Sequence, residues 1–169
     1  PKSVVMFDDV PYVWVYKVGP LIDETTIAHA VHADVGHDLR LLGYALDPAR
    51  APPGETVRLT LYWEAIHEPP GDYTVFTHLL DPAGRLRGQK DNQPQGGMYP
   101  THLWDEGERV QDEYELIIAP DAPPGTYQIA VGMYQLSTLR RLPVFDRNGS
   151  LLPDGRLLIP GPDVVQPPE

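Results

Sequence analysis

Hydrophobic and polar side chains alternate along several stretches of the chain. In residues 56–66, every second residue from Val57 to Ala65 is apolar, and the residues between them are mostly polar. Residues 110–118 and 127–135 show the same period of two. Because successive side chains of a β-strand point to opposite faces, each stretch is predicted to be a strand with one buried face. Further strands are predicted at residues 39–46, 73–80, 85–90 and 140–145.

Proline and glycine separate these stretches. The tripeptide Pro-Pro-Gly occurs at residues 52–54, 69–71 and 123–125, each time shortly before a predicted strand. Proline fixes φ and glycine accepts unusual φ values, so each tripeptide is interpreted as a corner that leads into a sheet. Residues 81–84, Asp-Pro-Ala-Gly, are typical of a type I turn. Strands separated by such turns predict an all-β fold, an antiparallel two-sheet sandwich.

Tyr127 directly follows the third of these corners. In Greek-key sandwiches, a tyrosine at such a corner returns its hydroxyl to the upstream backbone. This structural role favours an immunoglobulin-like Greek key over a jelly roll. The alternative interpretation is that Tyr127 is an ordinary core aromatic, which also fits two packed sheets.

The 169 residues are enough for one domain with a sizeable core. We expect residues 1–36 to be a lead-in strand and linker, residues 37–166 to be the sandwich and residues 167–169 to be a tail. Residues 12–18 alternate like a strand, whereas residues 26–35 fit either a short helix or, preferably, an extended segment. Residues 160–169 are predicted to be a strand remnant that runs into the tail.

The formal net charge of −11 excludes classes of partner. Nucleic-acid binding needs a basic surface, and anionic membrane surfaces are disfavoured for the same reason. The absence of cysteine excludes disulfides, cysteine-ligated zinc and a thiol nucleophile. No apolar run approaches the roughly 20 residues of a membrane helix, so we expect no membrane insertion by this segment. Its abrupt start suggests that it belongs to a longer protein.

Residues 91–112 are unusually rich in aromatic and polar side chains. Sugar sites pair an aromatic platform with a few placed polar groups. Trp104 or Tyr99 would be the platform. The polar partners would be Gln89, Asp91, Asn92 and His102. The alternative, which we favour, is a long crossing between sheets in which Trp104 is an apolar plug.

Alternation places Asp112 on the core side of its strand, with Val110 and Tyr114. A buried carboxylate needs backbone donors, an arginine or a cation. Asp91 and Asp105 would complete a calcium site, but the spacing matches no calcium loop. A structural hydrogen bond from loop backbone is therefore the preferred interpretation. Trp63 is likewise assigned a structural place on the core face of its strand.

The sequence offers little for catalysis. His29, His32 and His37 could hold zinc, but their spacing is no recognised signature, and a solvated lead-in segment is preferred. No serine nucleophile motif and no phosphate-binding loop are present. Carboxylate pairs such as Glu113 and Glu115 are predicted to face water rather than converge as in a glycosidase. The segment is therefore predicted to be a non-enzyme without a cofactor.

Several stretches together carry a family resemblance. They are GHDLRLLGYAL (36–46), TLYWEA (60–65), YTVFTHLLD (73–81), residues 89–112 ending in WDEGERVQD, PPGTYQIAVGMY (123–134) and RRLPVFDRNG (140–149). They resemble the soluble C-terminal domain of multi-spanning bacterial glycosyltransferases of the dolichyl-phosphate-mannose protein mannosyltransferase type. The resemblance covers roughly residues 35–165, and FDDVPYVWVYKV (7–18) is similar to the end of such a membrane region.

The resemblance implies a β-sandwich on the extracytoplasmic face of a membrane, attached to a glycosyltransferase. No position matches the catalytic acids of that family, so none is carried over. The leading hypothesis is a non-catalytic accessory domain that binds glycan or positions an acceptor. The alternative is an interaction module that docks on its own membrane domain or a neighbour through outward aromatics such as Tyr62 and Tyr134. A metal-dependent or carboxylate hydrolase is the third hypothesis.

Overall fold

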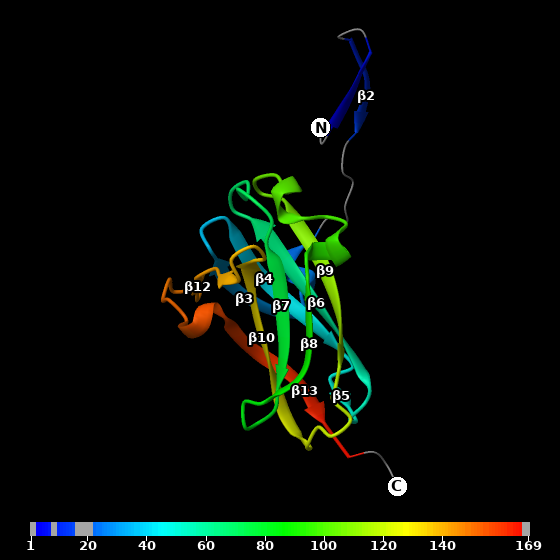
Figure 1. Cartoon of the computed structure of the whole chain (residues 1–169), viewed down its shortest axis with the longest axis vertical. Coiled ribbons are helices and arrows are strands. Elements are labelled where there is room, and N and C mark those ends of the chain that lie inside the picture. Colours follow the sequence, from blue (N-terminus) through cyan, green and yellow to red (C-terminus); the bar gives the residue numbers. More distant parts are fainter. Residues whose placement is uncertain (1–2, 8–9, 16–21, 167–169) are drawn as a thin grey trace.

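A computed structural model describes residues 3–7, 10–15 and 22–166. Two β-sheets pack face to face across one hydrophobic core (Figure 1). This arrangement confirms the prediction of an all-β sandwich. The preference for an immunoglobulin-like topology stays a prediction. Among the described residues, no helix combines the length and apolar character that a membrane crossing needs.

The first sheet has five strands. Their order across the sheet is β12 (Val144–Phe145), β3 (His29–Val35), β4 (Leu39–Asp47), β6 (Thr56–Ala65) and β9 (Arg109–Ile117). Every neighbouring pair is antiparallel. β9 forms one edge of this sheet, and its sequence is one of the most clearly alternating segments of the chain.

The second sheet has six strands. Five follow in the order β5 (Arg50–Ala51), β13 (Leu157–Val164), β10 (Gly125–Gln135), β7 (Thr74–Leu80) and β8 (Leu86–Asn92), and β11 (Arg140–Arg141) also pairs with β10. Only the short contact between β13 and β5 is parallel among the described pairs. A separate hairpin consists of β1 (Ser3–Phe7) and β2 (Val10–Val15). Short 3₁₀ helices lie at η1 (Glu24–Thr26), η2 (Pro94–Gly97), η3 (Thr101–Leu103) and η4 (Pro153–Gly155).

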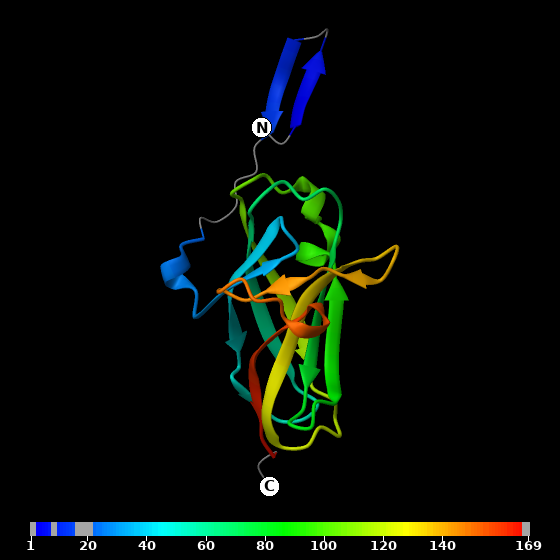
Figure 2. The same cartoon turned by 90° about the vertical axis from the view of Figure 1, so that its left-hand side faces the viewer.

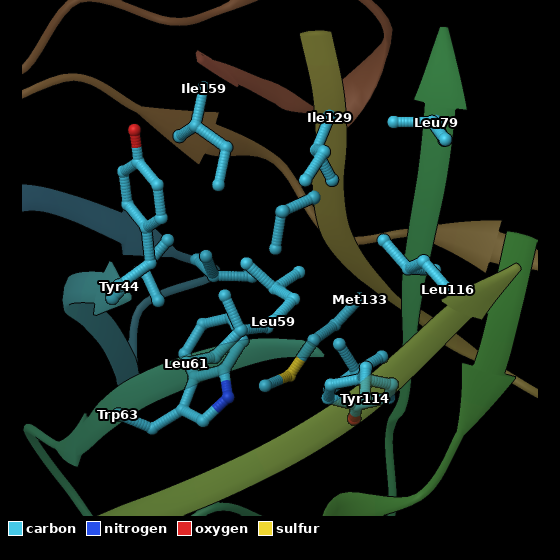
Figure 3. Close-up of a cluster of buried hydrophobic side chains, with 14 of the residues drawn as sticks. Tyr44, Leu59, Leu61, Trp63, Leu79, Tyr114, Leu116, Ile129, Met133 and Ile159 are labelled. Carbon is cyan, nitrogen blue, oxygen red and sulfur yellow. The ribbon is translucent and has the colours of Figure 1, made fainter. Parts of the chain in front are cut away.

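The core lies between the facing sides of the two sheets (Figure 3). On β6, Leu59, Leu61 and Trp63 are completely buried, as the alternation predicts. They meet Ile129 and Met133 from β10 of the opposite sheet. Full burial of a leucine-sized side chain contributes roughly 1.5–3 kcal/mol. This shared interior positions the outward side chains of both sheets, because each alternates with an anchored neighbour.

The predicted corners have specific hydrogen bonds. The Tyr127 hydroxyl donates to the carbonyl of Pro123 at 2.8 Å, the geometry of a tyrosine corner. In the turn between β7 and β8, the buried Asp81 carboxylate accepts from the backbone N–H groups of Ala83 and Arg85, both at 2.9 Å. Burial would raise the pKa of Asp81, but these donors and the Arg87 guanidinium lower it to about 2. The carboxylate therefore stays ionised and holds the turn.

Two predicted elements differ from the structure near the C-terminus. Residues 140–145 were predicted to be one strand, but the chain changes sheets between β11 and β12. The Leu142 N–H donates to Met133 in one sheet, and the Pro143 carbonyl accepts from Gly36 in the other. Residues 160–169 were predicted to be a strand remnant, whereas β13 is an eight-residue strand. Its prolines hid the alternation, and a register shift in β10 opposite them accommodates the missing donors.

The N-terminal expectations fall partly outside the described residues. Of the strand predicted at residues 12–18, the described part belongs to β2, and residues 16–18 lie outside the described range, as do residues 167–169. The extended interpretation of residues 26–35 is confirmed for residues 29–35 by β3, whereas Thr26 is the last residue of η1. Since β3 pairs with β4, residues 29–35 contribute to the first sheet although the sequence placed them in the lead-in segment.

Candidate functional site

The outer face of the second sheet contains a hollow of about 250 Å³. We call it the sheet-face hollow. It is lined by Phe76, His78, Asp91, Tyr134, Leu139 and Arg141. The residues come from β7, β8, β10, β11 and the turn between the last two.

Strand register explains why these side chains meet. Phe76 lies opposite Asp91 in the β7–β8 pair. Tyr134 lies opposite Arg141 in the β10–β11 pair. Residues directly opposite one another in antiparallel strands project to the same face. Alternation then places His78, two residues after Phe76, on this outer face as well.

Aromatic rings form the floor of the sheet-face hollow. The Phe76 ring is almost fully buried beneath the Arg141 guanidinium, which lies 4.4 Å from the ring centroid. The Tyr134 ring is half-buried, with its centroid 6.4 Å from that of Phe76. Gly132, directly opposite Phe76 in the β7–β10 pair, leaves the space that the Phe76 ring occupies, since an added Cβ would lie 2.6 Å from Phe76 Cζ. Tyr134 is therefore the more accessible aromatic surface.

Polar groups form one wall. His78 Nε2 lies 3.4 Å from Asp91 Oδ1. Burial lowers the pKa of His78, Asp91 opposes this effect, and Arg141 adds to it, so the pKa lies below the ordinary 6.5. Burial and the Asp91 carboxylate raise the pKa of the Tyr134 hydroxyl. At neutral pH the wall therefore presents a mostly neutral imidazole, a phenol and a carboxylate, which together can donate and accept hydrogen bonds.

A hydrogen bond with η4 holds the Arg141 side chain in place. Its Nη1 donates to the Asp154 carbonyl at 3.0 Å, and the Asp154 carboxylate pairs with Arg156 at 3.3 Å. These contacts tie η4 to the rim of the sheet-face hollow. The guanidinium is thus positioned by both a cation–π contact and a hydrogen bond.

The predicted aromatic platform lies elsewhere. Trp104 is buried, and its Nε1 donates to the Tyr99 carbonyl at 3.1 Å. The Tyr99 ring is also buried, and its hydroxyl donates to the Leu103 carbonyl at 2.9 Å. In this structure both rings are covered by protein, so neither presents a face to a ligand. Their contacts brace the crossing between β8 and β9.

The predicted polar partners are distributed over three places. Asp91 lines the sheet-face hollow, and Gln89 lies opposite His78 on the same side of the sheet. Asn92 lines a different hollow of about 360 Å³ between β8 and β9, together with Lys90. The Nδ1 atom of His102 lies 2.6 Å from Asp72 Oδ1, close to η3. The six predicted residues therefore do not converge on one site.

Sequence reasoning did not group Phe76, Tyr134 and Arg141 with Asp91. The available signal was the outward position of Tyr134 on an alternating strand. The missing information was the strand pairing, because residues 76 and 134 become neighbours only when β7 pairs with β10.

Asp112 is buried and has two close donors. It accepts from the Gln95 N–H at 2.8 Å and from the Tyr114 hydroxyl at 2.6 Å. The buried Trp63 Nε1 has no hydrogen-bond partner among the described residues, and its proximity favours the ionised form of Asp112. Burial nevertheless dominates and raises the pKa of Asp112 to about 6. The hydrogen bond from Gln95 attaches the loop between β8 and β9 to β9, as expected for a structural carboxylate.

The three histidines make separate contacts. His29 stacks on Tyr44 with ring centroids 4.7 Å apart, and His32 Nε2 lies 3.7 Å from Glu24. His37 stacks on Phe145. Within the described part of the chain, no group of three or more histidine or acidic side chains is arranged to hold a metal ion.

Comparison with known proteins shows the fold class. No family model matches the chain, and no curated protein matches it in sequence. The crystal structure of the C-terminal domain of Wzt superposes with a TM-score of 0.56 over 85% of this chain and 84% of that domain, at 8% identity. This likeness shows that the chain has the fold of a β-sandwich domain. A chain of a cohesin–dockerin complex has a TM-score of only 0.31 at 15% identity, over 69% of this chain and 94% of that chain.

Proposed function

We propose that this protein is a non-catalytic accessory β-sandwich that binds glycan in the sheet-face hollow. The observation that carries the proposal is the convergence of Tyr134, Asp91 and His78 in one hollow on an outer sheet face. This combination matches the needs of sugar recognition more closely than the buried Trp104 does.

The chemistry of a sugar ring fits these groups. One face of the ring is rich in C–H groups and packs on an aromatic surface, which Tyr134 provides. The ring hydroxyls need donors and acceptors, which His78 and Asp91 provide. The hollow of about 250 Å³ is smaller than the roughly 300–1,000 Å³ of sites for drug-sized ligands. It therefore suits one sugar unit of a longer glycan rather than a fully enclosed oligosaccharide.

The lining of the hollow supports a binding role rather than hydrolysis. Glycosidases place two carboxyl groups on either side of the bond that they cleave. Of the described residues that line the sheet-face hollow, Asp91 is the one carboxylate. We extend the proposal to a role beside a membrane glycosyltransferase on the extracytoplasmic face. That extension is supported by the sequence resemblance alone, since the likeness to the Wzt domain concerns the fold.

The outer face of the first sheet supports docking through Tyr62 less well. Arg40 donates to Asp34 at 2.6 Å, and Arg109 donates to Glu64 at 3.3 Å across this face. Arg109 also donates to the Ile22 carbonyl at 3.0 Å, which brings the segment before β3 onto the sheet. Charged pairs rather than a continuous apolar surface therefore surround half-buried Tyr62.

A glycan array followed by calorimetric titration tests the proposal. The array carries neutral hexoses, N-acetylhexosamines and uronic acids, and the strongest sugar is titrated into the wild type and variants. Tyr134→Ala should weaken binding by roughly tenfold or more, because the stacking surface is lost. Asp91→Asn should also weaken it by removing a charged acceptor.

Tyr62→Ala is the matched control, since Tyr62 is a half-buried tyrosine on the outer face of the other sheet. Its affinity should equal that of the wild type. Absence of binding to every sugar on the array would refute the glycan proposal. So would an equal loss of affinity in Tyr62→Ala and Tyr134→Ala.

A further inference from the structure

One segment of the chain differs in composition from the rest. We call residues 136–158 the crossing segment. It contains four arginines and two aspartates, a formal charge of +2, which leaves −13 on the rest of a chain whose total is −11. Its arginines are Arg140, Arg141, Arg147 and Arg156. The crossing segment is therefore a basic region on an acidic protein.

The crossing segment also concentrates exposed apolar side chains. It contains four of the eight large hydrophobic side chains that are exposed among the described residues. They are Leu136, Leu139, Leu151 and Leu158. The exposed fractions of Leu139 and Leu151 reach 71% and 65%. Other leucines of the segment, such as Leu142 and Leu152, pack against the core, so the exposure is selective.

The crossing segment covers one side of the sandwich. It begins at the turn after β10, pairs through β11 with the second sheet and through β12 with the first, and returns through η4 to β13. In Figure 2 it lies on the side that faces the viewer, with its two turns at opposite ends. One turn presents Leu136, Leu139 and Arg140, and the other presents Arg147 and Leu151.

The first turn holds a leucine in an unfavourable conformation. Leu139 has φ +56°, in the left-handed region that glycine or asparagine adopts at lower cost. Its N–H donates to the Gln135 carbonyl at 2.8 Å, which fixes the turn. Backbone strain of this kind is typical of functional positions. Here the strained backbone presents an apolar side chain to solvent, where it contributes nothing to the core.

The arginines at the two turns are available for an external partner. Arg141 and Arg156 contact Asp154, but the ion pairs among the described residues do not include Arg140 or Arg147. Guanidinium groups bind phosphate through paired hydrogen bonds. A surface that combines phosphates with an apolar layer beneath them would satisfy both the arginines and the leucines.

We propose that the crossing segment docks on an anionic lipid bilayer surface. Arg140 and Arg147 bind headgroup phosphates, and the leucines of the two turns enter the boundary between headgroups and acyl chains. The net charge of the whole chain argued against such a surface. However, charges more than about 8–10 Å apart are largely screened at physiological salt, so the contact is governed by the segment's own charges, four arginines against Asp146 and Asp154. The proposal is separate from glycan binding, although Leu139 and Arg141 border both surfaces.

Vesicle cosedimentation tests this proposal. The wild-type chain should sediment with vesicles of equal parts phosphatidylglycerol and phosphatidylcholine, and much less with phosphatidylcholine alone. The double variant Arg140→Gln/Arg147→Gln should lower the partition coefficient by roughly tenfold or more. Each basic residue near an anionic surface contributes favourably to the free energy of binding, and this variant loses two of them. The double variant Leu136→Ser/Leu151→Ser should also lower the partition coefficient. At high salt its loss should exceed that of the double arginine variant, because the apolar contribution dominates there.

Two controls lie outside the crossing segment. Leu86→Ser removes a leucine that is 49% exposed on β8, and Arg58→Gln removes an exposed arginine from β6. Neither should change sedimentation. Tyr134→Ala should retain vesicle binding, and the double arginine variant should retain sugar binding, so the two proposals fail separately.

Three outcomes would overturn the proposal. They are absence of sedimentation with the anionic vesicles, equal sedimentation with neutral vesicles, and equal losses in the control variants. Each variant replaces exposed side chains, so thermal unfolding should match the wild type and exclude misfolding as the cause of a loss.

Discussion

Replacement of Asp112 by asparagine should make the protein more stable at neutral pH. Asp112 is buried between the Gln95 N–H and the Tyr114 hydroxyl. Asparagine has nearly the same shape as a protonated carboxyl group and offers one acceptor and one donor. The Tyr114 hydroxyl, which donates to Asp112 in the wild type, can accept from that donor instead, so the contact is kept with its direction reversed.

The magnitude follows from the pKa of Asp112. Its pKa of about 6 in the folded protein lies above the ordinary pKa of 3.8, because burial disfavours the charged form. Between these values the folded state binds more protons than the unfolded state, so stability falls as pH rises through the window. The difference between about 6 and 3.8, at 1.36 kcal/mol per pH unit, gives about 3 kcal/mol. The free energy of unfolding of the asparagine variant should match that of the wild type at about pH 4 and exceed it by about 3 kcal/mol at neutral pH.

Urea unfolding at a series of pH values measures this difference. Fluorescence of the buried Trp63 and Trp104 reports the transition. Glu115→Gln is the control, because Glu115 lies on the same strand but is exposed. Its effect on the free energy of unfolding at neutral pH should be small beside that of Asp112→Asn. A constant offset between the Asp112→Asn variant and the wild type across the series would refute the burial argument, as would lower stability at neutral pH.

Two further substitutions test the fold around the site. Tyr127→Phe removes the hydroxyl that donates to Pro123 at 2.8 Å, and should lower the free energy of unfolding by about 1 kcal/mol in urea titration; an unchanged midpoint would contradict a stabilising corner. Gly132→Ala places a methyl group 2.6 Å from Phe76 Cζ and 2.7 Å from the Gly155 carbonyl, and should cost about 1–3 kcal/mol. Gly71→Ala, where nothing lies within 4 Å, should be nearly neutral by the same measurement, and equal effects of the two substitutions would contradict the crowding argument.

The sequence predicted the strands whose two faces differ in polarity. On β6, Leu59 and Leu61 alternate with polar residues because only one face meets the core, and that pattern is visible without any partner. β13 was largely missed, since Pro160, Gly161 and Pro162 interrupt its pattern. Its place in the sheet depends on β10 and β5 at its sides, which a local pattern does not contain.

The candidate site was harder to predict for a related reason. Asp91 was recognised as a polar residue of interest, but its partners Tyr134 and Arg141 come from β10 and β11, far away in the sequence. Trp104 attracted attention as an aromatic residue among polar ones, and that composition is shared by ligand platforms and by braced loops. Only burial distinguishes the two, and burial depends on how β8 and β9 are joined across the sandwich.

The passage from β11 to β12 also affects how the protein opens. A single short stretch is hydrogen-bonded to Met133 in one sheet and to Gly36 in the other. This stretch therefore joins the two sheets, and the sheets separate on this side only when these hydrogen bonds break. Amide protons of Gly36 and Leu142 should accordingly exchange with deuterium only when the whole domain unfolds, at the same slow rate as those in the middle of β10.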